Sequence, residues 1–269
     1  MAHAMPRAPK GGNGIAQKDV LWDGVLLEMC IDSVESAVAS AEGGADRVEL
    51  CANLLEGGTT PSLGLVRETR RRIDIGLAVM VRTRGGDFCP TAAEFSVMCE
   101  DVRVLREEGA DCLVLGILTA EGKVDRERTG ELLGLARPLE VTFHRAFDMT
   151  RDPIEALEDL IGLGVDRILT SGQETSVLEG LELIGELQAC AAGRIVIMPG
   201  CGITVRNIGK VIRTTGVSEV HVAVTEGEES PMRFRNGRVF MGTALRSEEF
   251  RRCVTRREAV SDLAGKLCE

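Results

Sequence analysis

Two cysteines stand at matching places in the first part of the chain. Cys30 follows Glu28 by two residues and Cys51 follows Glu49 in the same way, each at the end of an apolar run. Thiolates are soft ligands that favour Cu(I), zinc or iron–sulfur clusters. Zinc normally takes four ligands, and the sequence has no pair of Cys-x-x-Cys motifs to supply them, so two thiolates suit Cu(I) better. The alternative is a packing role, because free cysteine behaves as a small buried hydrophobe.

Glu28 and Glu49 are candidates for acid–base chemistry. Side chains alternate along a strand, so each glutamate is expected to share the inward face of its cysteine. A buried carboxylate has to be paired or protonated, since leaving it bare costs on the order of several kcal/mol. We expect Arg82 to be the partner, with Arg145 as a second one. The sequence leaves open whether these groups are catalytic or are ion pairs that brace the fold.

His144 is the third predicted catalytic residue. It is one of three histidines, with Arg145 beside it and Asp148 in the following loop, a setting that suits general acid–base work. His221 is a weaker candidate of the same kind. The alternative for both is a structural role, which a single histidine in a fold more often has.

Two glycine-containing loops could bind an anion. The first covers 82–87 and contains Arg82 and Arg84, and the second covers 199–204 and opens a predicted helix at Thr204. Backbone N–H groups at a helix N-terminus bind phosphate, although a tight turn alone would also need these glycines. Together the loops indicate a small phosphorylated or carboxylated molecule. The predicted anion-binding residues are Arg82, Arg84, Arg145, Ser171, Gly200 and Gly202.

A pattern that occurs four times predicts the elements that would position these residues. It begins with a glycine able to end a helix in the left-handed conformation, continues with a small or apolar residue and an Asp or Ser, and ends in a short apolar run. The four segments are Gly44–Leu50, Gly109–Leu115, Gly164–Thr170 and Gly216–Val222. Their spacing leaves room for one further strand and two helices in each interval. Four copies of this unit predict eight strands and eight helices in total.

The strands read as nearly continuous apolar runs, which is typical of a parallel sheet covered on both faces. They are expected at Val25–Cys30, Arg47–Cys51, Leu77–Arg82, Cys112–Gly116, Leu139–His144, Arg167–Ser171, Arg194–Met198 and Glu219–Val224. Strict alternation of strand and helix favours a single (β/α)8 TIM barrel, with an open doubly wound sheet as the alternative. In a barrel, the polar strand ends meet at one mouth.

The remaining segments and the composition set the outer limits. Residues 1–24 are predicted to be a disordered leader and 25–269 the barrel domain, with a loop at Ser230–Gly242 before a last helix near Glu248–Leu267. A net charge of −10 argues against nucleic acid as a partner, and no apolar run approaches the roughly 20 residues that cross a bilayer. Nine cysteines without a signal peptide indicate a reducing compartment.

Six segments carry motifs long enough to identify a family. They are Glu28–Ser33, Gly43–Cys51, Glu56–Ser62, Arg84–Phe88, Thr142–Asp148 and Leu169–Gly172. In this order they resemble the CutC family of copper-homeostasis proteins, most closely its animal members. The resemblance implies a (β/α)8 barrel, a cytoplasmic and nuclear location, a homo-oligomer (dimer or tetramer) and Cu(I) bound by the residues that match Cys30 and Cys51.

Some positions depart from the family's usual residues: Thr83, Pro90, Cys201 and Val222–Ala223. These changes fall on the anion-binding side and spare both cysteines. The first hypothesis is therefore a Cu(I)-binding protein that buffers or traffics copper. The second is an enzyme for an anionic metabolite, with His144 and Glu49 as acid–base groups and the three arginines as clamps. A scaffold for protein contacts is the third.

Overall fold

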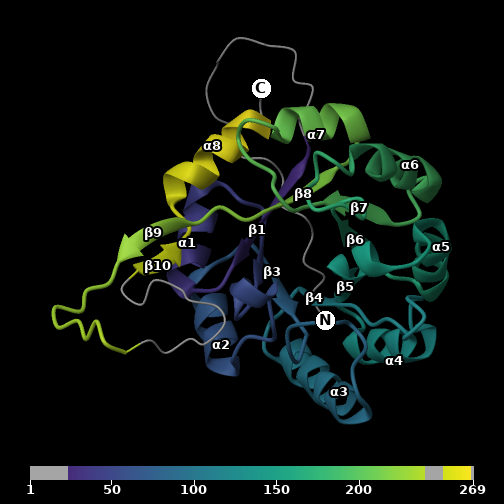
Figure 1. Cartoon of the computed structure of the whole chain (residues 1–269), viewed down its shortest axis with the longest axis horizontal. Helices are drawn as coiled ribbons and strands as arrows, with labels where there is room; N and C mark the ends of the chain where they lie inside the picture. The colour runs from purple at the N-terminus through teal and green to yellow at the C-terminus, as the bar shows by residue number, and fades with distance from the viewer. Residues whose placement is uncertain (1–23, 240–250, 268–269) are drawn as a thin grey trace.

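A computed structural model describes residues 24–239 and 251–267, so the predicted leader and the start of the last predicted helix lie outside the described residues. Eight short parallel strands form the centre of the fold, and helices surround them (Figure 1). The strands are β1 (Leu26–Ile31), β2 (Arg47–Leu50), β3 (Gly76–Met80), β4 (Cys112–Leu115), β5 (Glu140–Phe143), β6 (Arg167–Thr170), β7 (Val196–Pro199) and β8 (Glu219–Val222). All eight lie within two residues of the predicted ranges.

The helices that connect the strands form the outer layer. They are α1 (Val34–Gly43), α2 (Leu63–Arg72), α3 (Ala92–Glu107), α4 (Arg126–Ala136), α5 (Pro153–Leu163), α6 (Leu181–Ala191), α7 (Ile208–Thr215) and α8 (Arg257–Leu267), with short 3-10 helices η1 (Leu54–Glu56) and η2 (Arg145–Met149). Three of the helices begin next to a side chain that caps their first turn. Ser33 caps α1, Thr91 caps α3 through a capping box, and Asp152 with Pro153 opens α5.

The order of the strands makes the sheet a barrel. Each strand from β1 to β7 pairs in parallel with the next, and β1 also pairs with β8, so the last strand returns beside the first. Only the seam between β7 and β8 lacks a hydrogen-bonded ladder among the described residues. The predicted (β/α)8 barrel is confirmed, and the open doubly wound sheet is wrong.

The fourfold pattern has a structural explanation at the amino-terminal end of the barrel. Its glycines at 44, 109, 164 and 216 all have φ between 69° and 97°, the left-handed region that ends a helix. The aspartates that follow accept hydrogen bonds from the backbone N–H of a neighbouring strand: Asp46 from Leu27, Asp111 from Leu77 and Asp166 from Val141. Three of the four copies thus tie their strand to the one before it.

Two boundaries differ from the predictions. The helix expected at Thr204 begins at Ile208, because the Asn207 amide folds back and accepts a hydrogen bond from the Thr204 N–H. The last helix begins at Arg257 rather than near Glu248. The segment before it is β10 (Arg251–Val254), which pairs antiparallel with β9 (Glu226–Glu229), so its backbone groups are used in a ladder.

The main core lies between the barrel and the helices. Leu27, Met29, Val48 and Leu50 are fully buried there, as their alternation with polar residues predicts. Each such side chain contributes about 1.5–3 kcal/mol on burial. The opposite strand faces put charged and sulfur-containing side chains into the barrel. In the described part of the chain, every helix is too short or too polar to serve as a membrane span.

Candidate functional site

The two cysteines meet inside the mouth of the barrel. In the β1–β2 register Cys30 lies opposite Glu49, so Cys51 is displaced by two residues from a side-by-side position. The Sγ atoms of both cysteines and a carboxylate oxygen of Glu49 nevertheless all lie within 4.8 Å of one another. Both thiols are free and buried. The predicted pair is therefore brought together, with Glu49 as a third group.

The two thiols have opposite proton affinities. A hydrogen bond from the Cys51 thiol lowers the pKa of Cys30 well below its usual value, against the effect of burial. The same bond, with burial, raises the pKa of Cys51 well above its usual value. Cys112, which is also buried in the barrel, has a pKa raised to about 12 by burial. The lowered pKa favours the thiolate form of Cys30, which is the form that binds metals.

His221 is held next to the thiol pair by Glu28. The imidazole Nδ1 and a Glu28 carboxylate oxygen are 2.7 Å apart, and Nε2 lies 3.8 Å from a Glu49 oxygen. Burial alone would lower the pKa of His221, but Glu49, Cys30 and Glu28 raise it well above its usual value. A hydrogen bond to one ring nitrogen fixes the orientation of the imidazole and of its second nitrogen, as it does for histidines in metal sites.

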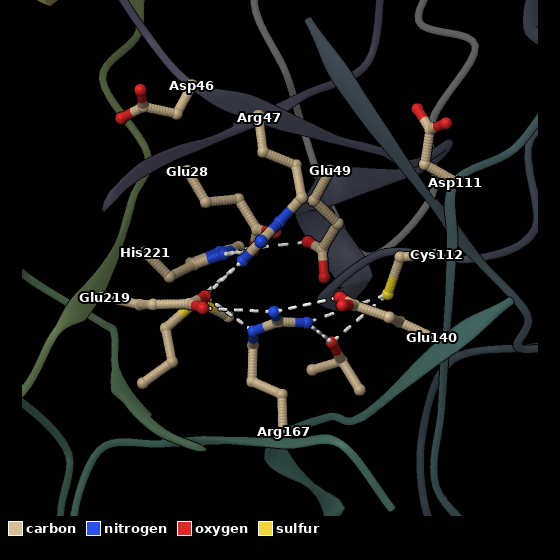
Figure 2. A network of polar contacts seen from close by, with 12 residues as sticks. Glu28, Asp46, Arg47, Glu49, Asp111, Cys112, Glu140, Arg167, Glu219 and His221 are labelled. Carbon is tan, nitrogen blue, oxygen red and sulfur yellow. Dashed lines mark hydrogen bonds and ion pairs between the residues drawn. The ribbon is translucent and has the colours of Figure 1, made fainter. Parts of the chain in front are cut away.

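Below these residues the barrel interior contains a layer of ion pairs (Figure 2). Arg47 pairs with Glu28 and with Glu219, the latter at 2.6 Å. Arg167 also pairs with Glu219, at 2.6 Å, and with Glu140 at 3.1 Å. Burial would raise the pKa of Glu28, yet Arg47 and His221 hold it at about 2. Glu28 is therefore a carboxylate that is fully engaged on both oxygens.

The prediction that Arg82 pairs with Glu28 and Glu49 is wrong. Glu28 instead pairs with Arg47, which lies directly opposite it in the β1–β2 register. Arg47 and Glu219 were missed although each stands two residues before a predicted site residue on the same strand face. The i, i+2 alternation that placed Glu49 and His221 in the barrel places these two residues there as well.

Arg82 lies beyond the end of β3 and contacts loop backbone. Its two terminal nitrogens donate to the carbonyls of Glu56, Gly58 and Gly86 at 2.8–3.0 Å. The guanidinium carbon lies 4.8 Å from the centre of the Phe88 ring. Carbonyl oxygens carry no net charge, so the positive charge of Arg82 is held in place without being neutralised.

Arg145 and Ser171 both donate hydrogen bonds to the carboxylate of a residue of this chain, Asp148. The Asp148 carboxylate accepts from the Arg145 Nε at 2.8 Å and from the Ser171 hydroxyl at 2.9 Å. It also accepts from the backbone N–H groups of Ser171 and Gln173 and from the Thr170 hydroxyl. Arg145 is thus also not the second partner of Glu28 and Glu49. The donors predicted to bind an external anion surround Asp148 instead.

The other predicted anion-binding residues are dispersed. Arg84 pairs with Glu94 at 2.7 Å and with Asp87 at 3.1 Å. Gly202 reaches the cavity wall, while Gly200 makes room for Leu169 and His221, because a Cβ at this position would come within 2.7 Å of a Leu169 methyl carbon and 3.2 Å of the imidazole. Arg82, Arg145 and Gly202 line one cavity at the mouth of the barrel, but Arg84, Ser171 and Gly200 are not part of its lining, so the six residues do not form one anion site.

His144 is a buried, neutral imidazole. Its Nδ1 accepts a hydrogen bond from the Ala146 N–H at 3.1 Å, and its Nε2 has no partner among the described residues. Burial, with the charge of Arg82, lowers its pKa to about 3. Gly116 is required beside it, since a Cβ there would come within 2.5 Å of the ring. Asp148, the predicted neighbour, is committed to Arg145.

We expect the His144 imidazole to remain neutral from about pH 8 to pH 4.5, because its folded pKa lies far below the ordinary value of 6.5. As the pH falls through about 6.5, the unfolded imidazole gains a proton that the folded one refuses, so this group removes stability on acidification. NMR of the histidine ring signals measures this directly, and a His144→Phe variant assigns the signal. A titration midpoint near 6.5 would show that the ring is accessible to water.

A cavity of about 1090 Å³ at the mouth of the barrel joins these groups. Cys30, Glu49, Arg82, His144 and His221 all line it. In the described ranges, five buried side-chain polar atoms lack a hydrogen-bond partner, and three of them belong to Glu49, Arg82 and His144. A buried polar atom without a partner costs about 1–3 kcal/mol, so their concentration here marks a functional site.

Comparison with known proteins assigns the chain to a family. The sequence model of the CutC family matches residues 25–226. This chain belongs to the CutC family. The human copper homeostasis protein cutC homolog is 48% identical over 249 residues, covering 93% of this chain and 89% of its own, and the mouse homolog is 49% identical over 233 residues, covering 87% and 86%.

The solved structures agree with this membership. CutC from Streptococcus agalactiae superposes with a TM-score of 0.71 at 36% identity, covering 73% of this chain and 97% of its own. The motifs quoted from the sequence therefore identified the CutC family correctly, and with it the barrel. Copper homeostasis is the role that the names of the human and mouse relatives give.

Proposed function

We propose that this chain binds Cu(I) through the thiolates of Cys30 and Cys51 and contributes to intracellular copper buffering or trafficking. The observation that carries the proposal is the pair of free thiols, whose sulfur atoms lie within 4.8 Å of each other beside the cavity, with the pKa of Cys30 well below its usual value. Membership of a copper-homeostasis family supports the choice of metal.

The donor set fits Cu(I) better than zinc. Soft thiolates select Cu(I), while a structural zinc site takes four ligands. Among the described residues, only Glu49 adds a further oxygen donor within 4.8 Å of both sulfurs, and burial raises the pKa of this carboxyl well above its usual value. A carboxyl whose pKa is raised in this way is a weaker metal ligand than an ordinary carboxylate, so the two sulfurs are the main donors and suit a metal with a low coordination number.

The position of the pair suits a carrier rather than a permanent store. Cys30 lines the cavity and Cys51 lies behind it, so one of the two sulfurs faces the opening. An incoming thiolate can then approach the metal from the cavity side and take it over by ligand exchange. Location in the cytoplasm and nucleus, and assembly into a dimer or tetramer, form part of this proposal and rest on the resemblance to animal CutC proteins.

Protection from alkylation tests the proposal on the unmodified chain. With one equivalent of Cu(I), Cys30 and Cys51 should become at least ~10-fold slower to react with a thiol reagent, because metal-bound thiolate is removed from the nucleophilic pool. The exposed Cys89 and Cys190 serve as internal controls that keep their rates. Mass spectrometry of peptides measures each site. Protection at the control cysteines instead of the pair contradicts the proposal.

A further inference from the structure

The cavity contains two N–H groups that the thiol pair does not use. Arg82 is 8% exposed and forms no ion pair with a carboxylate of the described residues. Its terminal nitrogens are occupied by backbone carbonyls, while its Nε has no hydrogen-bond partner among those residues. Arg82 therefore lines the cavity with a positive charge that Glu56 and Asp87 offset only through space, and its buried Nε is a donor without a partner among the described residues.

His144 supplies the second donor. Because its Nδ1 accepts from the Ala146 N–H, the ring proton of the neutral imidazole has to be on Nε2. This residue is 3% exposed, and the Nε2 atom has no partner in the part of the chain that the structure describes. Both donors contact one aromatic ring, since the Phe88 centroid lies 5.1 Å from the His144 centroid and 4.8 Å from the Arg82 guanidinium carbon.

The cavity has the size and lining of a site for an organic molecule. Its volume of about 1090 Å³ lies at the upper end of the range of small-molecule pockets, and a single metal ion leaves most of it empty. Apolar side chains form much of the cavity wall, among them Leu54, Met80, Phe88 and Leu169. An apolar wall with a few converging polar groups is typical of such pockets.

We propose that this cavity binds a small organic carboxylate, whose oxygens accept hydrogen bonds from the Nε–H of Arg82 and the Nε2–H of His144. The charge of the carboxylate neutralises Arg82, and its apolar part packs against Phe88 and the neighbouring wall. This function goes beyond copper binding, and neither donor belongs to the thiol pair.

Competing ligand chemistries fit the same groups less well. A phosphate monoester carries up to two charges and needs more donors than these two. The remaining candidates for that role, Arg84 and Arg145, are already paired with Asp87, Glu94 and Asp148. A primary amide offers an acceptor oxygen but leaves the charge of Arg82 uncompensated. A carboxylate satisfies both the charge and the two donors.

The test uses the full-length chain and three matched sets of probes: small aliphatic and aryl monocarboxylates, their primary amides, and phosphate monoesters of the same carbon skeletons. Ligand-observed NMR and thermal shift at about 5 mM probe measure binding. We expect carboxylates to bind and to raise the melting temperature, with the matching amides and phosphates at least ~10-fold weaker, as charge-assisted hydrogen bonds predict. Absence of carboxylate binding, or equal binding of the amides, overturns the proposal.

Variants show where the carboxylate binds and separate this binding from the binding of copper. His144→Phe keeps the ring shape and removes the donor, and Arg82→Lys keeps the charge and removes the Nε–H; each should weaken carboxylate binding at least ~10-fold. Arg84→Lys, whose parent side chain is ion-paired, is the matched control and should bind like the wild type. Cys30→Ser with Cys51→Ser should also keep carboxylate binding. If the thiol double variant loses carboxylate binding while His144→Phe and Arg82→Lys retain it, the site has been placed wrongly.

Discussion

Replacing both Cys30 and Cys51 by serine is expected to abolish stoichiometric Cu(I) binding. The hydroxyl oxygens that result are hard, neutral donors, and Cu(I) prefers soft thiolates, so we expect the affinity to fall by at least ~100-fold. An anaerobic titration against a chromogenic Cu(I) chelator measures both the stoichiometry and the affinity. The metal-free variant should remain folded, because a serine hydroxyl at position 51 keeps one proton to donate in the place where the Cys51 sulfur lies 3.5 Å from a Glu49 oxygen.

A matched pair of cysteines provides the control. Cys89 and Cys190 are exposed and do not line the cavity, so the Cys89→Ser, Cys190→Ser variant removes the same number of thiols and should bind Cu(I) like the wild type. Single variants at Cys30 and Cys51 should each lose most of the binding, since one thiolate alone is an incomplete site. Full binding by the Cys30, Cys51 double variant would rule out this pair as the copper site.

Removing Arg47 is expected to cost far more stability than removing an arginine from the surface of the protein. An Arg47→Met variant leaves Glu28 without its guanidinium partner inside the barrel, while Glu219 loses one of its two arginines and keeps Arg167. Breaking a buried ion pair on one side destabilises by about 3–5 kcal/mol, because an uncompensated charge stays buried. Equilibrium unfolding in denaturant, followed by circular dichroism, gives the free energy of unfolding for comparison with the wild type.

The controls for Arg47→Met use an exposed pair and a compensating change. Arg71 pairs with Glu68 at 3.3 Å on the surface of α2, and Arg71→Met should change the free energy of unfolding by about 0.5 kcal/mol or less. Adding Glu28→Gln to Arg47→Met removes the carboxylate charge that has lost its arginine partner and should recover part of the loss. If Arg47→Met is no more destabilising than Arg71→Met, the ion layer does not support the barrel.

The ion pairs inside the barrel also determine how the stability of the protein changes in acid. The folded pKa of Glu28, about 2, lies below its ordinary value of 4.5. Its contribution to stability is therefore complete above about pH 4.5 and is lost as the pH falls from there towards 2. Without Arg47 this contribution disappears, so the stability difference between wild type and Arg47→Met should narrow in acid. That narrowing distinguishes an electrostatic loss from a simple packing defect.

The barrel could be predicted from the sequence because its signals are local. A glycine that ends a helix, an aspartate or serine and a short apolar run repeat four times, and each signal involves neighbours in the chain. The β9–β10 ribbon gave no such signal. Glu226–Glu229 contains three glutamates and a glycine, which have low strand propensity, and it becomes a strand by pairing with Arg251–Val254, far along the chain.

The site was predictable only in part, because the sequence of one strand does not show which residue of the next strand lies opposite it. Alternation along single strands placed Cys30 and Cys51 on the inward face correctly. The partner of Glu28 depended on which residue lies opposite it in the next strand, and that residue is Arg47 rather than the more distant Arg82. The role of Asp148 could not be predicted from the sequence either. Only the packed loops reveal that this carboxylate fills the place expected for an external anion.

The aspartate braces of the fourfold pattern have a consequence for how such a protein can diverge. Asp46, Asp111 and Asp166 secure the strands at the amino-terminal end, and the thiols and the cavity lie at the other end. Residues at the mouth can therefore be exchanged during evolution without loosening the frame that carries them. A lineage can lose or alter its ligand chemistry while the barrel itself, and with it the recognisable sequence, is inherited intact.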